Sequence, residues 1–226
     1  MERLESVREQ VERIKRLQQE RGKMSPIRSD EETVNLESFG IYKRYEKSTF
    51  ENIEKVIPAQ HRNAFNECRE YAENFAEHKK KGVGMILKGP VGTGKTSLAV
   101  AILQKVIRSH GGGLFIPMAS LMDNLLTMSK RDAEEAVRFE NRVRSTPLLI
   151  LDDLGAEYEN NWVRTKVDAI ITERCNRLLP VIVTTNLKAE ELLSTYQERV
   201  YDRLKGCSLI VNFAGESMRK APRRGA

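Results

Sequence analysis

The sequence has no apolar run long enough to cross a membrane, and it has few cysteines. Its longest apolar runs, residues 147–151 and 180–183, fall far short of the roughly 20 residues that a spanning helix needs. The first ten residues, MERLESVREQ, alternate in charge and lack the apolar segment of a secretory signal, so we expect a cytoplasmic protein. Cys68, Cys175 and Cys207 form no CxxC pair and have no histidine cluster nearby, so we expect ordinary thiols and neither a disulfide framework nor a zinc site.

Glycine, proline and aromatic residues are also scarce. The 226 residues include 14 Gly, 7 Pro and 6% aromatics, whereas 40% are hydrophobic, which excludes a collagen-like or wholly disordered chain. The net charge is +6, and seven basic but only three acidic residues fall in positions 196–226. Because the rest of the chain is nearly balanced, this excess is weak support for nucleic-acid binding.

The N-terminal residues have the apolar spacing of an amphipathic helix. Apolar side chains recur every three or four positions at Leu4, Val7, Val11, Ile14 and Leu17. One helix cannot bury this stripe alone, so it packs on the main body, pairs with a copy of itself or binds a partner. A polar stretch without periodicity follows. We expect a helix within residues 1–22, a linker over 23–47 and a folded domain over 48–226.

Beyond Lys81, short apolar runs alternate with helical stretches, a pattern typical of a parallel sheet covered by helices. The candidate strands are residues 84–87, 113–116, 148–151, 181–184 and 208–211. A helical pattern over residues 57–75 precedes them. The predicted fold is therefore α/β, with three layers built around a five-stranded parallel sheet.

The loop after the first candidate strand fits GxxxxGK[ST] in full and opens a helix over about 95–106. Its glycines let successive N–H groups point inward, and the helix N-terminus adds partial positive charge. We expect Lys95 to reach the β- and γ-phosphates of ATP and the Thr96 hydroxyl to bind Mg²⁺. The alternative is a glycine-rich turn that binds no phosphate. The candidate nucleotide-binding residues of this loop are Gly89, Pro90, Val91, Gly92, Thr93, Gly94, Lys95, Thr96 and Ser97.

Two adjacent carboxylates, Asp152 and Asp153, end the third candidate strand. Ligands bind at this end of the strands in open α/β sheets. We assign Asp152 to the Mg²⁺ shell and Asp153 to polarising the attacking water. The alternative for either residue is to cap the next turn or helix.

Five motifs together, GPVGTGKT, LLILDDLG, VIVTTNL, ERVYDRL and SMR, resemble those of the AAA+ ATPases. The likeness is to the DnaC/DnaI-type replicative helicase loaders and the related IstB-like transposition ATPases, and it covers roughly residues 48–220. The resemblance implies an AAA+ P-loop core. It also implies that Asn186 is the sensor 1 residue, which orients the lytic water or the γ-phosphate; a plain turn residue is the alternative.

The same resemblance gives roles to three arginines and one aromatic residue. Arg203 is similar to the arginine finger that reaches a neighbouring subunit's nucleotide, and Arg199, on the same helix face, is a second candidate. Arg219 resembles sensor 2, which acts on the γ-phosphate in its own subunit. Alternatively, all three simply solvate a basic region. Phe50, in the stretch STFENI, resembles a residue lining the adenine pocket.

As a whole, the resemblance implies an ATP-dependent loader of a DnaB-type hexameric helicase onto single-stranded DNA during replication initiation, from a bacterium or a phage. It also implies self-assembly through a shared ATP site, and residues 1–22 are the candidate helicase-docking segment. Residues 120–144 have the place of the insertion that contacts single-stranded DNA in loaders; because their net charge is zero, a solvated helix pair is the alternative. Because Asp153 stands where many AAA+ proteins have Glu, we expect slow, switch-like ATP hydrolysis. The alternatives are an IstB-like transposition helper that binds duplex DNA and a nucleotide-dependent adaptor with little hydrolysis.

Overall fold

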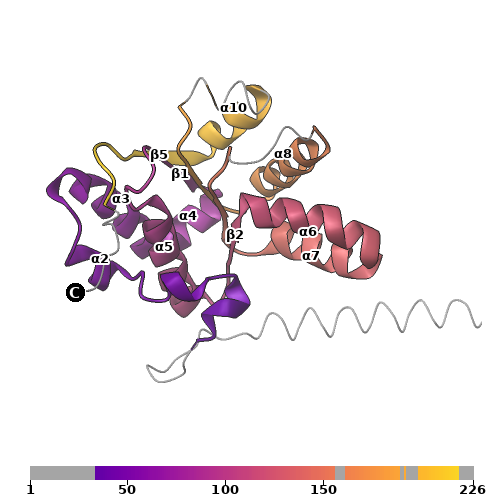
Figure 1. Cartoon of the computed structure of the whole chain (residues 1–226), viewed down its shortest axis with the longest axis horizontal. Helices are drawn as coiled ribbons and strands as arrows, with labels where there is room; N and C mark the ends of the chain where they lie inside the picture. Colours follow the sequence, from indigo (N-terminus) through magenta and orange to yellow (C-terminus); the bar gives the residue numbers. More distant parts are fainter. Residues whose placement is uncertain (1–33, 156–160, 189–190, 192–197, 219–226) are drawn as a thin grey trace, which may run out of the picture.

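The structure is a computed structural model that describes residues 34–155, 161–188, 191 and 198–218 (Figure 1). The predicted helix within residues 1–22 therefore lies outside the described residues. None of the described helices is long and apolar enough to cross a membrane.

Five parallel strands form one sheet in the described part of the chain, in the order β2-β3-β4-β1-β5. They are β1 (Gly84–Lys88), β2 (Leu114–Pro117), β3 (Leu149–Asp152), β4 (Val181–Thr185) and β5 (Ser208–Asn212). This confirms the predicted α/β fold, and each strand begins and ends within one residue of its predicted range. Because all the strands run the same way, the carboxyl ends of β1, β3 and β4 meet at one edge of the sheet.

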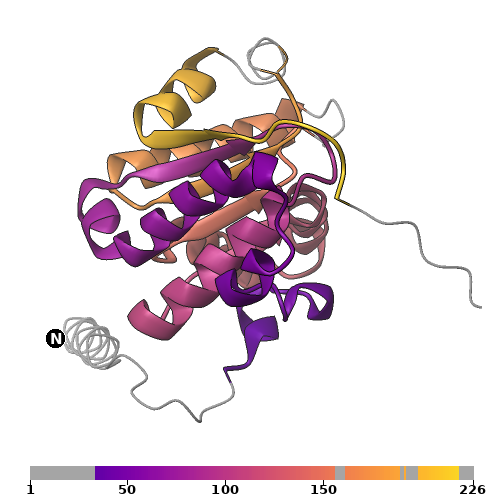
Figure 2. The ribbon, with the colours of Figure 1, turned by 90° about the vertical axis from the view of Figure 1, so that its left-hand side faces the viewer.

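Helices cover both faces of this sheet, as Figure 2 shows. They are η1 (Leu36–Phe39), η2 (Lys43–Tyr45), α2 (Phe50–Glu54), η3 (Ala59–His61), α3 (Arg62–Glu73), α4 (Phe75–Lys81), α5 (Lys95–His110), α6 (Met118–Arg131), α7 (Ala133–Ser145), α8 (Asn161–Asn176) and α10 (Glu198–Gly206). The helix predicted over residues 57–75 is instead divided into η3, α3 and the start of α4.

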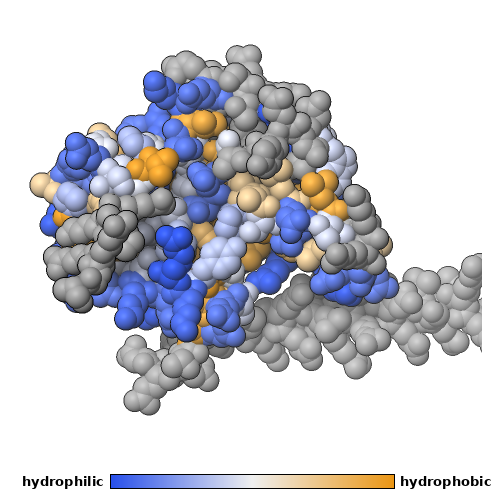
Figure 3. Space-filling view, viewed as in Figure 1, coloured by the Kyte–Doolittle hydropathy of each residue, from blue (hydrophilic) through white to orange (hydrophobic). Residues whose placement is uncertain are grey.

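Alternate strand residues point into two separate apolar clusters, which gives the three layers. Met85 and Ile150 belong to the cluster under α3 and α5. Their chain neighbours Ile86 and Leu151 belong to the cluster under α6, α7, α8 and α10. On the face shown in Figure 3, the described hydrophobic residues form small groups among hydrophilic ones. The main apolar burial of the domain is therefore in these two clusters.

The last part of the predicted linker packs on the domain. Ile41 is only 1% exposed and belongs to the core cluster under α5. The buried Gln104 side chain, on α5, donates from Nε2 to the carbonyl oxygens of Tyr45, Glu46 and Ser48 at 3.2, 3.1 and 3.2 Å. Residues 34–47 therefore belong to the folded body, which differs from the predicted boundary at residue 48.

Candidate nucleotide-binding site

The loop that follows β1 turns tightly before α5. Gly89, Gly92 and Gly94 have φ values of 150°, 83° and 90°, a region that residues with a Cβ rarely adopt. The Thr93 hydroxyl donates to the carbonyl oxygen of Pro90 at 2.8 Å. The glycines therefore allow a compact loop at the carboxyl end of β1, and the threonine closes it.

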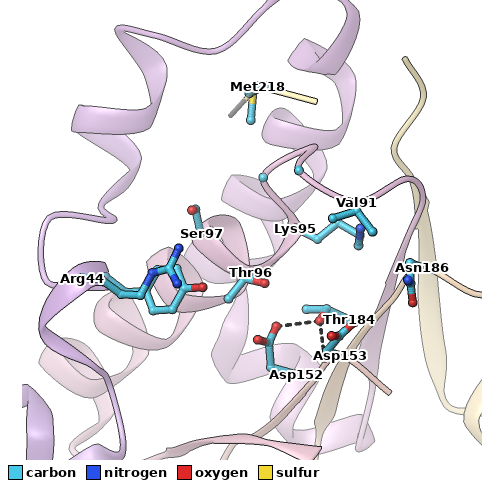
Figure 4. A pocket seen from close by; sticks show the side chains of 13 residues that line it. Arg44, Val91, Lys95, Thr96, Ser97, Asp152, Asp153, Thr184, Asn186 and Met218 are labelled. Atoms are coloured by element: carbon cyan, nitrogen blue, oxygen red, sulfur yellow. Dashed lines mark hydrogen bonds between the residues drawn. The ribbon is translucent and has the colours of Figure 1, made fainter. Parts of the chain in front are cut away.

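Lys95 is the first residue of α5, and its side chain turns back over the loop (Figure 4). Its Nζ donates to the carbonyl oxygens of Gly89 and Pro90 at 2.7 and 2.8 Å. The helix begins after Gly94, with no side chain capping its N-terminus. An uncapped helix N-terminus beside a largely buried ammonium group favours a bound anion such as a phosphate.

Asp152 ends β3 and lies against two threonine hydroxyls. Thr184 Oγ1 donates to Asp152 Oδ1 at 2.6 Å, and Thr96 lines the same cavity, near enough to the carboxyl group to act on its pKa. Burial raises the pKa of Asp152 and the charge of Asp153 adds to the effect, whereas the two threonines and Lys95 oppose it. The structure therefore brings together Thr96 and Asp152, the two side chains predicted to bind Mg²⁺.

Asp153 has a φ of 62°, which is uncommon for a residue with a side chain. Its N–H donates to Thr184 Oγ1 at 2.9 Å, so one threonine hydroxyl bonds to both acidic residues, as Figure 4 shows. Asn186 follows β4 and lines the same pocket. Unusual backbone conformations of this kind cluster at functional sites.

These side chains line a cavity of about 460 Å³ at the carboxyl ends of β1, β3 and β4. Small-ligand pockets have volumes of roughly 300–1,000 Å³. Nine of the predicted site residues line it, namely Val91, Gly92, Gly94, Lys95, Thr96, Ser97, Asp152, Asp153 and Asn186. Gly89, Pro90 and Thr93 shape the loop without lining the cavity.

Four further lining residues had no predicted role. Arg44 and Tyr45 come from η2, and the Arg44 guanidinium carbon lies 4.9 Å from the centre of the Tyr45 ring. The N–H of Met218 donates to the carbonyl oxygen of Gly92 at 2.8 Å, which brings the C-terminal segment onto the loop. Thr184 and Met218 lie within the quoted motifs VIVTTNL and SMR, whereas no motif included Arg44 or Tyr45.

Phe50, predicted to line the adenine pocket, is not among the residues around this cavity. It is 8% exposed, and its ring packs edge-on against Phe65, with the ring centroids 5.7 Å apart. The first residue of α2 thus contributes its ring to the core beneath α3 and α5, where aromatic burial stabilises the fold.

The predicted arginines do not line the cavity in the described part of the chain. Arg203 Nη1, on α10, donates to Thr172 Oγ1 at 2.5 Å and lies 3.8 Å from Asp168 Oδ1, both on α8. Arg199 belongs to α10, but its side chain and the whole of Arg219 lie outside the described residues. Their roles stay predictions.

The helices α6 and α7 occupy the place of the predicted DNA-contacting insertion. Arg138 pairs with Glu134 and Arg144 pairs with Glu140, each at 3.4 Å. The side chains of residues 130–131 lie outside the described residues. Since these two arginines are partly neutralised within the chain, the predicted contact with single-stranded DNA gains no support from them.

The cavity residues fit a nucleoside triphosphate with its magnesium ion. Mg²⁺ is usually bound through one or two carboxylates together with phosphate oxygens and waters. Thr96 and Asp152 provide oxygen ligands of this kind. No group of three or more His, Cys, Asp or Glu among the described residues could hold a metal alone, so phosphate oxygens and water would complete the shell. Lys95 and the α5 N-terminus supply positive charge for the phosphates.

Comparisons with known proteins agree with this geometry. A family model described as "IstB-like ATP binding protein" matches residues 7–226. The replicative helicase loader DnaC of Escherichia coli K12 is 28% identical over 181 residues, which cover 80% of this chain and 72% of that protein. The crystal structure of the DnaC helicase loader superposes with a TM-score of 0.68 at 28% identity, covering 76% of this chain and 100% of that one. The structure of AMPPCP-bound DnaA from Aquifex aeolicus is 20% identical, with a TM-score of 0.62 that covers 74% of this chain and 50% of that chain. This likeness supports the AAA+ fold alone.

Proposed function

Since the chain belongs to the family of IstB-like ATP-binding proteins and is related to the DnaC helicase loaders, we propose that it loads a DnaB-type hexameric helicase onto single-stranded DNA at the initiation of replication. The observation that carries this proposal is the 28% identity to DnaC over 80% of the chain, together with the cavity that the phosphate-type loop, Asp152 and Asn186 line. ATP binding drives assembly in this proposal, and hydrolysis releases the helicase.

The ATP-binding part of the proposal rests on the loop between β1 and α5. Lys95 would exchange its bonds to the loop carbonyls for the β- and γ-phosphates, since charge-assisted bonds to phosphate are the stronger ones. Thr96 and Asp152 would hold Mg²⁺. When bound, this ion would neutralise charge that develops on the phosphates. Asp153 would orient the attacking water from a backbone position that Thr184 holds.

Hydrolysis in this proposal depends on assembly of several copies of the chain. Arg203 is the candidate residue acting on a neighbour's nucleotide, and its contacts with Asp168 and Thr172 would then be broken as α10 meets the next subunit. The two side chains of this ion pair are 33% and 21% exposed, and a solvent-screened pair of this kind contributes only modest stability, so exchanging it costs little. Arg199, on the same helix, is the second candidate.

The proposal is tested by a pull-down of a DnaB-type helicase with the full chain as bait, in the presence of ATP, of ADP and of no nucleotide. We expect ATP to increase recovery of the helicase. The Lys95→Ala variant should lose this increase, whereas Lys105→Ala, a change of an exposed lysine on the same helix, should keep it. Removal of residues 1–22 should abolish recovery if that segment docks the helicase. Equal recovery without nucleotide, or none under any condition, would contradict the loader proposal.

A second candidate function is that of a transposition helper that binds duplex DNA. The matching family model, which spans residues 7–226 and carries the IstB name, favours it. The ATP site would be the same, but the ligand would differ. ATP-dependent binding to duplex DNA, by a protein that recovers no helicase, would favour this second function over the first.

A further inference from the structure

Two cysteines that are distant in sequence lie together beside the sheet. The Sγ atoms of Cys175 and Cys207 are 2.8 Å apart. Cys175 is in the last turn of α8, and Cys207 connects α10 to β5. A disulfide bond is about 2.04 Å long, so the sulfurs need to approach by less than about 1 Å. The side chains thus already face each other across a junction between two elements.

We propose that Cys175 and Cys207 form a reversible dithiol–disulfide site that a hydroperoxide oxidises. The two residues are partly exposed, which gives an oxidant access to the sulfurs. Cys68 provides the contrast, since it is fully buried in the core under α3 and α5. This inference is independent of the proposed function, because neither cysteine lines the nucleotide cavity.

The two sulfurs react in turn, Cys207 with the peroxide and Cys175 with the oxidised Cys207. The hydrogen bond with Cys175 lowers the pKa of Cys207, so Cys207 is the more readily ionised thiol. Its thiolate attacks the peroxide, which breaks the O–O bond to form a sulfenic acid and release water or an alcohol. The Cys175 sulfur then attacks the sulfenic sulfur, and its proton leaves with the hydroxide as a second molecule of water. Two thiols and one peroxide thus give one disulfide.

Closing this bond would anchor α10 on α8. The N–H of Cys207 donates to the carbonyl oxygen of Arg203, and the Arg203 side chain already bonds to Thr172 on α8. The bond would also close a loop of the chain between positions 175 and 207, which limits the freedom of the unfolded chain. We therefore expect the oxidised protein to melt at a higher temperature, by roughly 5 °C.

The test treats the purified full chain with hydrogen peroxide, blocks free thiols with N-ethylmaleimide and maps the peptides without reduction. With the alkylation carried out in denaturant, so that buried Cys68 reacts too, we expect one intramolecular cross-link between Cys175 and Cys207 and an alkylated Cys68. The oxidised chain should also have a raised Tm that dithiothreitol reverses. Cys68→Ser should keep the cross-link, and Cys175→Ser should lose both the cross-link and the Tm shift. Mapping of the wild-type chain decides the question even if a variant folds poorly. Alkylation of both Cys175 and Cys207 after peroxide treatment, or disulfides that form only between chains, would overturn the proposal.

Discussion

Among the residues that the structure describes, Arg174 has the largest fully buried side chain, and it joins three segments of the domain. Its guanidinium donates to the carbonyl oxygens of Val143, Thr146 and Pro180, each at 2.9 Å. These carbonyls lie at the end of α7 and just before β3 and β4. Burial lowers the pKa of Arg174 to about 9, which still leaves a cation at neutral pH. The residue therefore fixes the amino ends of the two strands whose carboxyl ends lead to Asp152 and Asn186.

We expect Arg174→Ala to lower the free energy of unfolding by about 4 kcal/mol. Three buried carbonyls without a donor cost about 3 kcal/mol, and loss of the packed aliphatic stem adds about 2 kcal/mol. Release of the guanidinium from its buried position offsets about 1 kcal/mol of this. Arg174→Met keeps the stem and should therefore cost only about 2 kcal/mol. Urea unfolding with a common m-value measures both free energies.

Arg177→Ala is the matched control, since Arg177 lies almost one turn further along the chain with a side chain that is 52% exposed. Its ion pair with Glu173 is a surface pair, so the variant should lose less than about 0.5 kcal/mol. If Arg174→Ala also lost less than about 1 kcal/mol, the carbonyl contacts would not stabilise the domain, and the reasoning would be wrong.

Three further predictions concern the cavity and the proposed subunit contact. Because burial raises the pKa of Asp152, its ionised form destabilises the folded chain, and stability without nucleotide should rise as the pH falls through that pKa. Asp152→Asn should therefore raise the Tm at pH 7 while reducing Mg²⁺-dependent ATP turnover on the order of 100-fold; an unchanged turnover would exclude Asp152 from the metal site. Asp153→Asn should keep ATP affinity but reduce turnover on the order of 100-fold, measured by phosphate release, and a loss of affinity instead would count against its role toward water. Arg203→Ala should keep ATP affinity and lose the rise of specific activity with protein concentration, whereas Lys205→Ala should keep both; full activity in the first variant would favour Arg199.

Most of the sheet could be predicted because β1, β2, β3 and β4 are buried along nearly their whole length, unlike the edge strand β5. A continuous apolar run such as residues 148–151 is the pattern of a buried strand. The GxxxxGK[ST] loop then indicated where β1 ends and where α5 begins. Because the predicted strands are parallel, Asp152 and Asn186 were expected at the same edge of the sheet, at the carboxyl ends of their strands. Most of the cavity wall was therefore predictable without coordinates.

Contacts made by single side chains across long distances in sequence were not predictable. Gln104 holds the segment containing Tyr45 through carbonyl oxygens, and no periodicity marks such a contact. Residues 34–47 were therefore assigned to a linker, and Arg44 was missed at the cavity. Cys175 and Cys207 were interpreted as ordinary thiols for the same reason, because spacing in the chain does not reveal that α8 meets the start of β5.

Phe50, the residue predicted to line the adenine pocket, packs its ring in the core beneath α3 and α5. The resemblance to the loader pattern favoured a place beside the nucleotide, but burial of the ring against Phe65 stabilises the packing of α2 on the core. Tyr45 is instead the aromatic residue that lines the cavity. The role of Phe50 toward the adenine therefore stays a prediction, and Tyr45 is a cavity residue that lies outside the motif STFENI.

The central claim is that the cavity at the carboxyl ends of β1, β3 and β4 binds ATP with Mg²⁺. Isothermal titration of a non-hydrolysable ATP analogue into the full chain, with Mg²⁺ present, tests it most directly. The chain and its Lys105→Ala variant should bind the analogue with the same Kd. Lys95→Ala should weaken binding on the order of 100-fold, because it removes a charge-assisted contact with the phosphates. Equal affinity of the Lys95→Ala variant would contradict the assignment of this loop and of the site built on it.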